Sequence, residues 1–173
     1  MSNQAATHFH HVPHLAPPPV AAEVSEETLW AGDILVSDKR IRMTTVLGSC
    51  VSVCLFDRLR CYGGMNHFLL PSPGEGGRHG EWSIRELYLR MLDLGCLPRN
   101  IKAKVFGGGS PLALANDFSA VGPANARVAF DTLCKLGVIV VGESVVGNSG
   151  MRLYFENWTG LVLVRSHRER SEA

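Results

Sequence analysis

The sequence predicts one domain of the α/β (α+β) class, a sandwich of mixed, largely antiparallel sheets covered by helices. The first half of the chain carries short apolar stretches with the alternation that is typical of strands. The second half alternates helical patterns with strands, and no internal repeat divides the chain. The length of 173 residues suits a single domain, and its 46% hydrophobic content is sufficient for a core.

The first 28 residues differ in composition from the rest of the chain. Four of the seven histidines and four of the nine prolines precede Val20, without helical or strand periodicity. The histidines are His8, His10, His11 and His14. A metal would need a preformed geometry that such a segment lacks, so a solvated tail is favoured. We therefore expect a disordered tail over 1–28, a folded domain over 29–166 and a charged tail over 167–173.

Four strands are predicted in the first half of the domain. Alternating apolar and β-branched residues mark 33–37 and 40–47, on either side of a polar turn. The stretch 51–56 alternates again, and 62–70 is a fourth strand that ends at Pro71 and a loop rich in Gly, Pro and Ser.

Two helices and four more strands are predicted after this loop. Apolar residues recur at helical spacing over 82–94, with Gly95 as the stop, and a second helix runs from about Pro123 to Gly137. A short strand over 102–106 lies between the helices. The last strands are 138–146 and a hairpin of 151–156 with 161–165 across a turn at 157–160.

Charge and hydropathy exclude two classes of partner. Seventeen basic and sixteen acidic residues leave a net charge of +1, whereas binding to nucleic acid or an anionic membrane surface requires a basic excess. No apolar run approaches the roughly 20 residues that span a bilayer, and the N-terminus lacks the apolar stretch of a signal peptide. We expect a cytoplasmic protein without membrane insertion, and the odd number of five cysteines fits that reducing compartment.

Cys50 and His67 are the residues in this sequence that most clearly suggest chemistry. If their strands form a hairpin about the polar turn 57–60 and Phe56 pairs with Cys61, Cys50 faces His67 directly. Opposed side chains have β-carbons roughly 4.5 to 5.5 Å apart, which allows a thiol to contact an imidazole. A shift of one residue would place the two side chains on opposite faces of the sheet.

A cysteine beside a histidine is typical of a nucleophile and its base. The histidine accepts the thiol proton and generates the reactive thiolate. Gly48 and Ser49 precede Cys50 in a predicted turn that would leave backbone N–H groups free to stabilise an oxyanion. A hydroxyl from Thr44 or Thr45 would orient the imidazole, provided that the chain turns back at this point.

Three other interpretations compete with catalysis. Cys50 and Cys54 on one strand would lie about 13 Å apart, too far for one zinc ion, so no metal is expected. A lone cysteine and a lone histidine in apolar strands are often inert core residues. The glycines at 107–109 follow a strand as in a phosphate loop, but they lack the dinucleotide and Walker motifs, so a substrate-facing or structural turn is favoured.

Several ordered motifs resemble the family of bacterial chemoreceptor glutamine deamidases known as CheD. They are TTVLGSCVSV at 44–53, GGMNHFLLP at 63–71, KVFGGG at 104–109 and VGNSG at 146–150. The resemblance covers 29–165. It implies a fold similar to that of deamidating-toxin cysteine hydrolases, with Cys50 as nucleophile, His67 as base and Thr44 as the orienting residue.

The implied reaction converts glutamine side chains of methyl-accepting chemotaxis receptors to glutamate through a Cys50 thioester, with no cofactor. Gly48 and Ser49 would support the oxyanion, and Asn66, Gly107 and Gly108 are candidates for contact with the substrate. The resemblance also implies a chemotaxis phosphatase of the CheC type as a possible partner. Alternatives are a receptor methyl ester hydrolase, a peptidase, or a binding module for the phosphatase or receptor.

Overall fold

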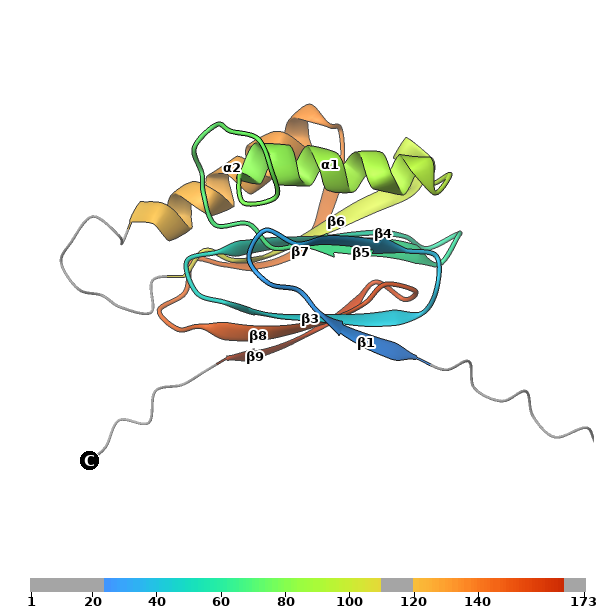
Figure 1. Cartoon of the computed structure of the whole chain (residues 1–173), viewed down its shortest axis with the longest axis horizontal. Coiled ribbons are helices and arrows are strands. Elements are labelled where there is room, and N and C mark those ends of the chain that lie inside the picture. The colour runs from blue at the N-terminus through green and yellow to red at the C-terminus, as the bar shows by residue number, and fades with distance from the viewer. Residues whose placement is uncertain (1–23, 110–119, 167–173) are drawn as a thin grey trace, which may run out of the picture.

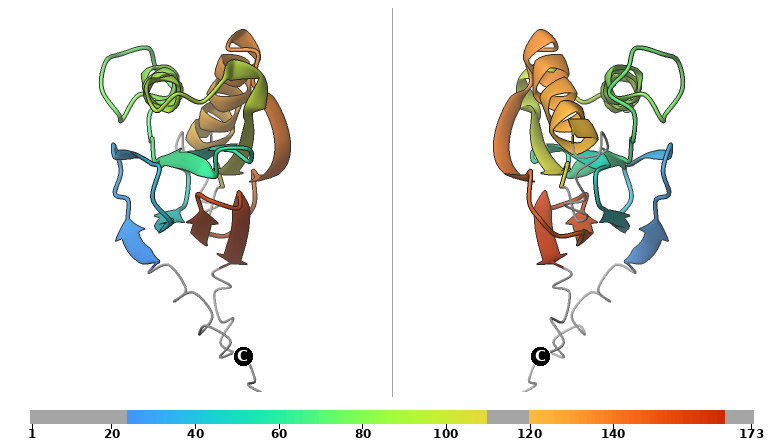
Figure 2. Two further views of the ribbon diagram at one scale, coloured as in Figure 1. Left: turned by 90° about the vertical axis from the view of Figure 1, so that its right-hand side faces the viewer. Right: turned by 90° about the vertical axis from the view of Figure 1, so that its left-hand side faces the viewer.

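The computed structural model describes residues 24–109 and 120–166 as three stacked layers. Two helices cover one face of a five-stranded sheet, and a four-stranded sheet packs against the other face (Figure 1). The end-on views show the same order of layers (Figure 2). The predicted class, a sandwich of mixed sheets with helices, is confirmed, with both helices on one side.

The five-stranded sheet carries most of the predicted strands. Its order is β2 (Ile34–Ser37), β5 (Tyr62–Asn66), β4 (Val51–Asp57), β6 (Ile101–Gly107) and β7 (Ile139–Val145). Only the β6–β7 pair is parallel. A short 3-10 helix over Pro98–Asn100 leads into β6.

The four-stranded sheet joins the two ends of the domain. Its order is β1 (Ser25–Thr28), β3 (Ile41–Leu47), β8 (Met151–Glu156) and β9 (Leu161–Ser166). The predicted β8–β9 hairpin is confirmed as antiparallel. Met43, Leu47 and Phe155 of this sheet pack with Cys54 and Phe56 of β4 in an inter-sheet core.

The two helices pack through the apolar faces that the sequence predicts. Helix α1 (Gly80–Asp93) buries Ile84, Leu87 and Met91, and α2 (Val121–Lys135) buries Ala126, Ala129 and Leu133. These side chains form a second core on the five-stranded sheet. Both helices begin and end within two residues of their predicted bounds. No helix among residues 24–109 and 120–166 is long and apolar enough to cross a bilayer.

Two sequence predictions need correction. The tail predicted over 1–28 ends earlier, because Ser25–Thr28 forms β1, in parallel with β3. All four residues are exposed, so the pairing depends on backbone hydrogen bonds and leaves no apolar pattern to detect. The strand predicted over 62–70 ends at Asn66. Residues 1–23, 167–173 and the predicted histidine cluster lie outside the described part of the chain.

Asn157 holds the corner where the chain passes from β2 in one sheet to β3 in the other. Its amide N–H₂ donates to the carbonyls of Ser37 and Lys39 at 2.9 and 2.8 Å, and its Oδ1 accepts the N–H of Ile41 at 2.9 Å. The residue is 1% exposed. One buried amide therefore satisfies three backbone groups at the end of the sandwich where β4 ends.

We predict that Asn157→Ala lowers the free energy of unfolding by about 2–4 kcal/mol, since it leaves buried backbone groups without partners. Urea denaturation followed by circular dichroism measures the change. Asn148→Ala, the same substitution at an exposed position, is the control and is expected to change stability by less than about 0.5 kcal/mol. Equal effects of the two variants would contradict this role.

Candidate active site

Cys50 lies where the chain crosses from the four-stranded to the five-stranded sheet. Residues 48–50 connect β3 to β4 and are half-buried. The Cys50 side chain packs against the inter-sheet core. The connection from β7 to β8 lies at the same end, since Gly109 approaches the carbonyls of both Gly48 and Gly147 (left in Figure 1).

The predicted β4–β5 hairpin exists, but the predicted register is wrong by two residues. Asp57 pairs with Tyr62, so the turn is 58–61 rather than 57–60. Asp57 Oδ1 accepts hydrogen bonds from the N–H groups of Leu59 and Arg60 in this turn. Cys61 adopts a positive φ of 58°, which a cysteine in a sequence does not predict. A shift of two residues keeps each side chain on its face, so Cys50 and His67 become diagonal neighbours.

Asn66 explains why β5 separates from β4 just before His67. Its Oδ1 accepts the N–H of Val53 at 2.7 Å, its amide donates to Ser83 of α1 at 2.9 Å, and its carbonyl accepts the Ser52 hydroxyl. Side-chain hydrogen bonds thus replace the ladder at this point. Asn66 is fully buried and engaged in these bonds, which gives it a structural role in the free protein; its predicted contact with substrate stays a prediction.

His67 is held by the segment that follows β1. Its N–H donates to the Asp33 carbonyl at 3.0 Å, and its carbonyl accepts the Gly32 N–H at 2.7 Å. Its Nδ1 lies 2.9 Å from the hydroxyl oxygen of Thr45. Beyond His67 the ladder resumes, because Phe68 and Val51 exchange both backbone hydrogen bonds. The imidazole therefore lies between the two sheets, and its ring is hydrogen-bonded to Thr45 of β3.

The Thr45 hydroxyl also determines the tautomer of His67. It donates its single proton to the Leu29 carbonyl at 2.8 Å, so its oxygen accepts the proton on Nδ1 of His67. The other ring nitrogen, Nε2, is then unprotonated. Nε2 is buried and has no hydrogen-bond partner among the described residues. A histidine in this state can accept a proton.

The structure places the orienting contact at Thr45, whereas the resemblance assigned it to Thr44. Strand alternation sends Thr45 inward with Met43 and Leu47, and Thr44 to the outer face of the sheet with its cross-strand partner Tyr154. Thr44 is buried there but cannot reach between the sheets.

The predicted oxyanion residues belong to a loop whose carbonyls are all engaged. The Gly109 N–H donates to the Gly48 carbonyl at 2.9 Å, and the Gly108 N–H donates to the Cys50 carbonyl at 2.8 Å. Asn125 of α2 donates to the Ser49 carbonyl at 3.0 Å. Within the described residues, no carbonyl accepts from the N–H groups of Ser49 and Cys50.

Gly107 and Gly108 support this loop and are buried, and their predicted contact with substrate stays a prediction. Gly107 has a φ of 104°, and a Cβ there would collide with the Cys50 carbonyl. Gly108 has a φ of 65° and packs against α2 at Gly122. Both positions require glycine because the backbone passes so close to the Cys50 loop.

Burial keeps Cys50 and His67 neutral in the free protein. Desolvation raises the pKa of the Cys50 thiol, and a hydrogen bond from its own backbone N–H partly offsets this. Desolvation lowers the pKa of His67, against the opposing effects of the Leu29 carbonyl and the Asp33 charge. This arrangement favours proton transfer from thiol to imidazole during reaction over a preformed ion pair.

The other cysteines differ from Cys50 in exposure. Cys54 and Cys96 are buried, and desolvation raises the pKa of both thiols, to about 11 for Cys96. Cys61 and Cys134 are exposed. In the ranges 24–109 and 120–166, no three His, Cys, Asp or Glu side chains are grouped as metal ligands.

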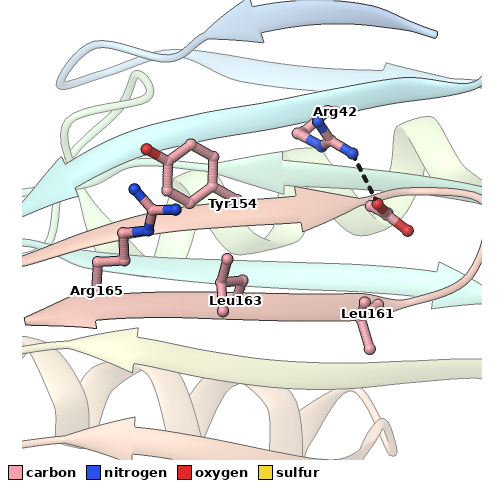
Figure 3. Close-up of a pocket in the computed structure, with 6 residues that line it drawn as sticks. Arg42, Tyr154, Leu161, Leu163 and Arg165 are labelled. Carbon is pink, nitrogen blue, oxygen red and sulfur yellow. Dashed lines mark hydrogen bonds and ion pairs between the residues drawn. The ribbon is translucent and has the colours of Figure 1, made fainter.

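A separate hollow of about 350 Å³ lies on the outer face of the four-stranded sheet (Figure 3). Arg42 and Glu156, neighbours in its lining, form an ion pair at 3.0 Å, and Arg165 lies 5.6 Å from the centre of the Tyr154 ring. Neither Cys50 nor His67 lines this hollow. No cysteine or histidine lines it, so the candidate site stays at the Cys50 loop.

The sequence did not indicate Asn125, and it left Thr45 undecided against Thr44. Asn125 is a polar residue in a helical pattern, with nothing in the sequence to mark its contacts. Thr45 was one of two candidates, and the inward parity of Met43 and Leu47 is the signal that distinguishes it from Thr44.

Comparison with known proteins identifies one family. The family model described as "CheD chemotactic sensory transduction" matches residues 69–166, a span that follows Cys50 and His67. A protein of Rhodospirillum rubrum named "Probable chemoreceptor glutamine deamidase CheD" is 39% identical over 72% of this chain and 72% of its own length. One of the same name from Agrobacterium fabrum is 41% identical over 70% of this chain and 68% of its own. The Bacillus licheniformis hypothetical protein YfiH has a TM-score of 0.47 and 16% identity over 67% of this chain and 51% of that chain.

We predict that Thr45→Val slows alkylation of Cys50 by iodoacetamide near neutral pH by roughly 3- to 10-fold, because loss of one hydrogen bond leaves the imidazole tautomer unfixed. Peptide mapping by mass spectrometry measures the rate at Cys50 alone. Thr44→Val, an isosteric change on the outer face, is the control and should leave the rate near that of the unmodified protein. A larger effect from Thr44→Val would restore the assignment made by resemblance.

We also predict a pH-dependent contribution of His67 to stability. Because its pKa is lowered in the folded state, the unfolded chain binds the proton first as the pH falls below the ordinary value of 6.5. Stability from neutral His67 is therefore complete above that pH and declines below it. The difference in unfolding free energy between the unmodified protein and His67→Gln should shrink from pH 7.5 to pH 5, measured by urea denaturation. A constant or growing difference would contradict the lowered pKa.

Proposed function

The chain belongs to the CheD family, and from this membership and the geometry of Cys50 and His67 we propose that it is a cytoplasmic chemoreceptor glutamine deamidase. The relatives reported above carry that activity in their names. One observation carries the proposal: Thr45 fixes His67 with an Nε2 that has no hydrogen-bond partner among the described residues, and half-buried Cys50 lies directly before the adjacent strand β4. Such a pair serves acyl transfer from an uncharged amide.

The first half of the reaction forms a thioester. His67 Nε2 takes the thiol proton as Cys50 Sγ attacks the glutamine carboxamide carbon, and the carbonyl oxygen becomes an oxyanion. The N–H groups of Ser49 and Cys50 stabilise that oxyanion. The carbon–nitrogen bond then breaks, His67 returns its proton to the nitrogen, and ammonia leaves.

The second half releases glutamate. Water gives a proton to His67 Nε2 and attacks the thioester carbonyl, again through an oxyanion. The carbon–sulfur bond breaks, the proton returns to Cys50, and a glutamyl side chain remains on the receptor. The sum is hydrolysis of one amide, with no redox step.

Mass spectrometry of candidate receptors tests this proposal. A deamidated glutamine gains about one dalton because a hydroxyl replaces the NH₂ of the side-chain amide, whereas hydrolysis of a glutamyl methyl ester loses about 14 daltons. We predict the gain with the unmodified protein and its absence with Cys50→Ala. Cys54→Ala, a buried cysteine on the same strand face, is the control and should retain the activity.

A methyl loss in place of the gain would assign ester hydrolysis to the site. Deamidation that persists in Cys50→Ala would contradict the proposed nucleophile. Receptor that stays unchanged but is retained by the protein on a column would favour a binding module.

A further inference from the structure

Asn125 links the two segments that carry the proposed catalytic residues. It lies in the second turn of α2 and is fully buried. Its amide nitrogen lies 3.0 Å from the carbonyl of Ser49, next to Cys50, and 3.0 Å from that of Leu69, two residues after His67. Both of its N–H donors are therefore used on these two carbonyls.

The Ser49 carbonyl belongs to the same peptide unit as the Cys50 N–H. In a planar trans peptide the C=O and N–H groups point in opposite directions, and the chain contains no cis peptide among its described residues. A donor that holds the Ser49 carbonyl on the α2 side therefore directs the Cys50 N–H away from α2. No other donor among the described residues contacts this carbonyl.

The neighbouring peptide units are held by the backbone in the same manner. Gly109 holds the Gly48 carbonyl, and Gly108 holds the Cys50 carbonyl. Asn125 of helix α2 supplies the third donor because the first turn of α2 approaches the glycine turn closely at Gly122. A Cβ at Gly122 would lie within 2.7 Å of the carbonyl oxygens of both Gly108 and Gly109. The glycine turn, the start of α2 and the Cys50 loop thus pack as one unit.

We infer that Asn125 is a positioning residue for the oxyanion hole: by holding the Ser49 carbonyl, it fixes the direction in which the Cys50 N–H meets the developing negative charge. This inference rests on the proposed acyl transfer at Cys50. Oriented donors that do not have to reorganise during reaction are among the largest contributions to such catalysis. Asn125 itself is too buried to touch the substrate.

Two reactions of the same thiol separate this role from a general structural one. Acylation of Cys50 by p-nitrophenyl acetate forms a carbon–sulfur bond through an oxyanion and releases p-nitrophenolate. Alkylation by iodoacetamide displaces iodide and passes through no oxyanion. The ratio of the two rates therefore reports the oxyanion hole, whereas the alkylation rate alone reports the thiolate and its base.

The experiment uses the full chain with the two exposed thiols replaced, as Cys61→Asn, which tolerates the positive φ, and Cys134→Ser. In this background Asn125→Ala is expected to slow acylation by about 10- to 100-fold and to change alkylation by less than about twofold. Asn125→Ser, which can donate to only one of the two carbonyls, should lose less. Asn125→Ser also replaces Asn125→Ala as the test variant if circular dichroism shows that Asn125→Ala folds poorly.

Asn157→Ala is the matched control, because Asn157 is also a buried amide that donates to two carbonyls, at the opposite end of the sandwich. It should lose stability and keep the ratio of the two rates. An unchanged ratio in both Asn125 variants, or an equal fall of both rates, would overturn the inference. The test needs no receptor, so unmodified receptor glutamines would contradict only the proposed function.

Discussion

The hydrogen bond between Thr45 and His67 joins the two sheets, and the rest of the site depends on it. Thr45 belongs to the four-stranded sheet and His67 follows a strand of the five-stranded sheet. The bond exists only if the sheets pack at the correct separation, which the inter-sheet core of Met43, Phe56 and Phe155 determines. Packing of apolar side chains thus holds the hydrogen bond that fixes the tautomer of His67.

Around Cys50 the backbone carbonyls hold the loop in place, whereas the N–H groups of Ser49 and Cys50 donate to no carbonyl among the described residues. Three consecutive carbonyls are bonded to Gly109, Asn125 and Gly108, so the loop has little freedom to rotate. The backbone at 107 and 108 can lie this close to the Cys50 loop only because both residues are glycine, since a Cβ at 107 would displace the loop. Cys50 is therefore held in one orientation on this loop, although the residue is only half-buried.

Much of the fold was predictable because apolar residues recur with the period of each element, as in β8, where buried positions alternate with more exposed ones. Ser25–Thr28 was missed because an exposed strand held by backbone bonds carries no such pattern. Cys50 and His67 were identified as a pair, but their register was not, since the positive φ of Cys61 leaves no mark in the sequence. Thr45 could be identified only once the inward face of β3 was known, and Asn125 only from the tertiary contact that α2 makes with the Cys50 loop.

The pairing of β3 with β8 has a consequence for how the site forms. Arg42 and Glu156 meet across these strands although 114 residues separate them. Contacts so distant in sequence form late, after the loop-closure entropy has been overcome, and slow the folding of a domain. A nascent chain that has already produced Thr45, Cys50 and His67 therefore lacks the assembled candidate site until its last two strands emerge and complete the sheet around β3.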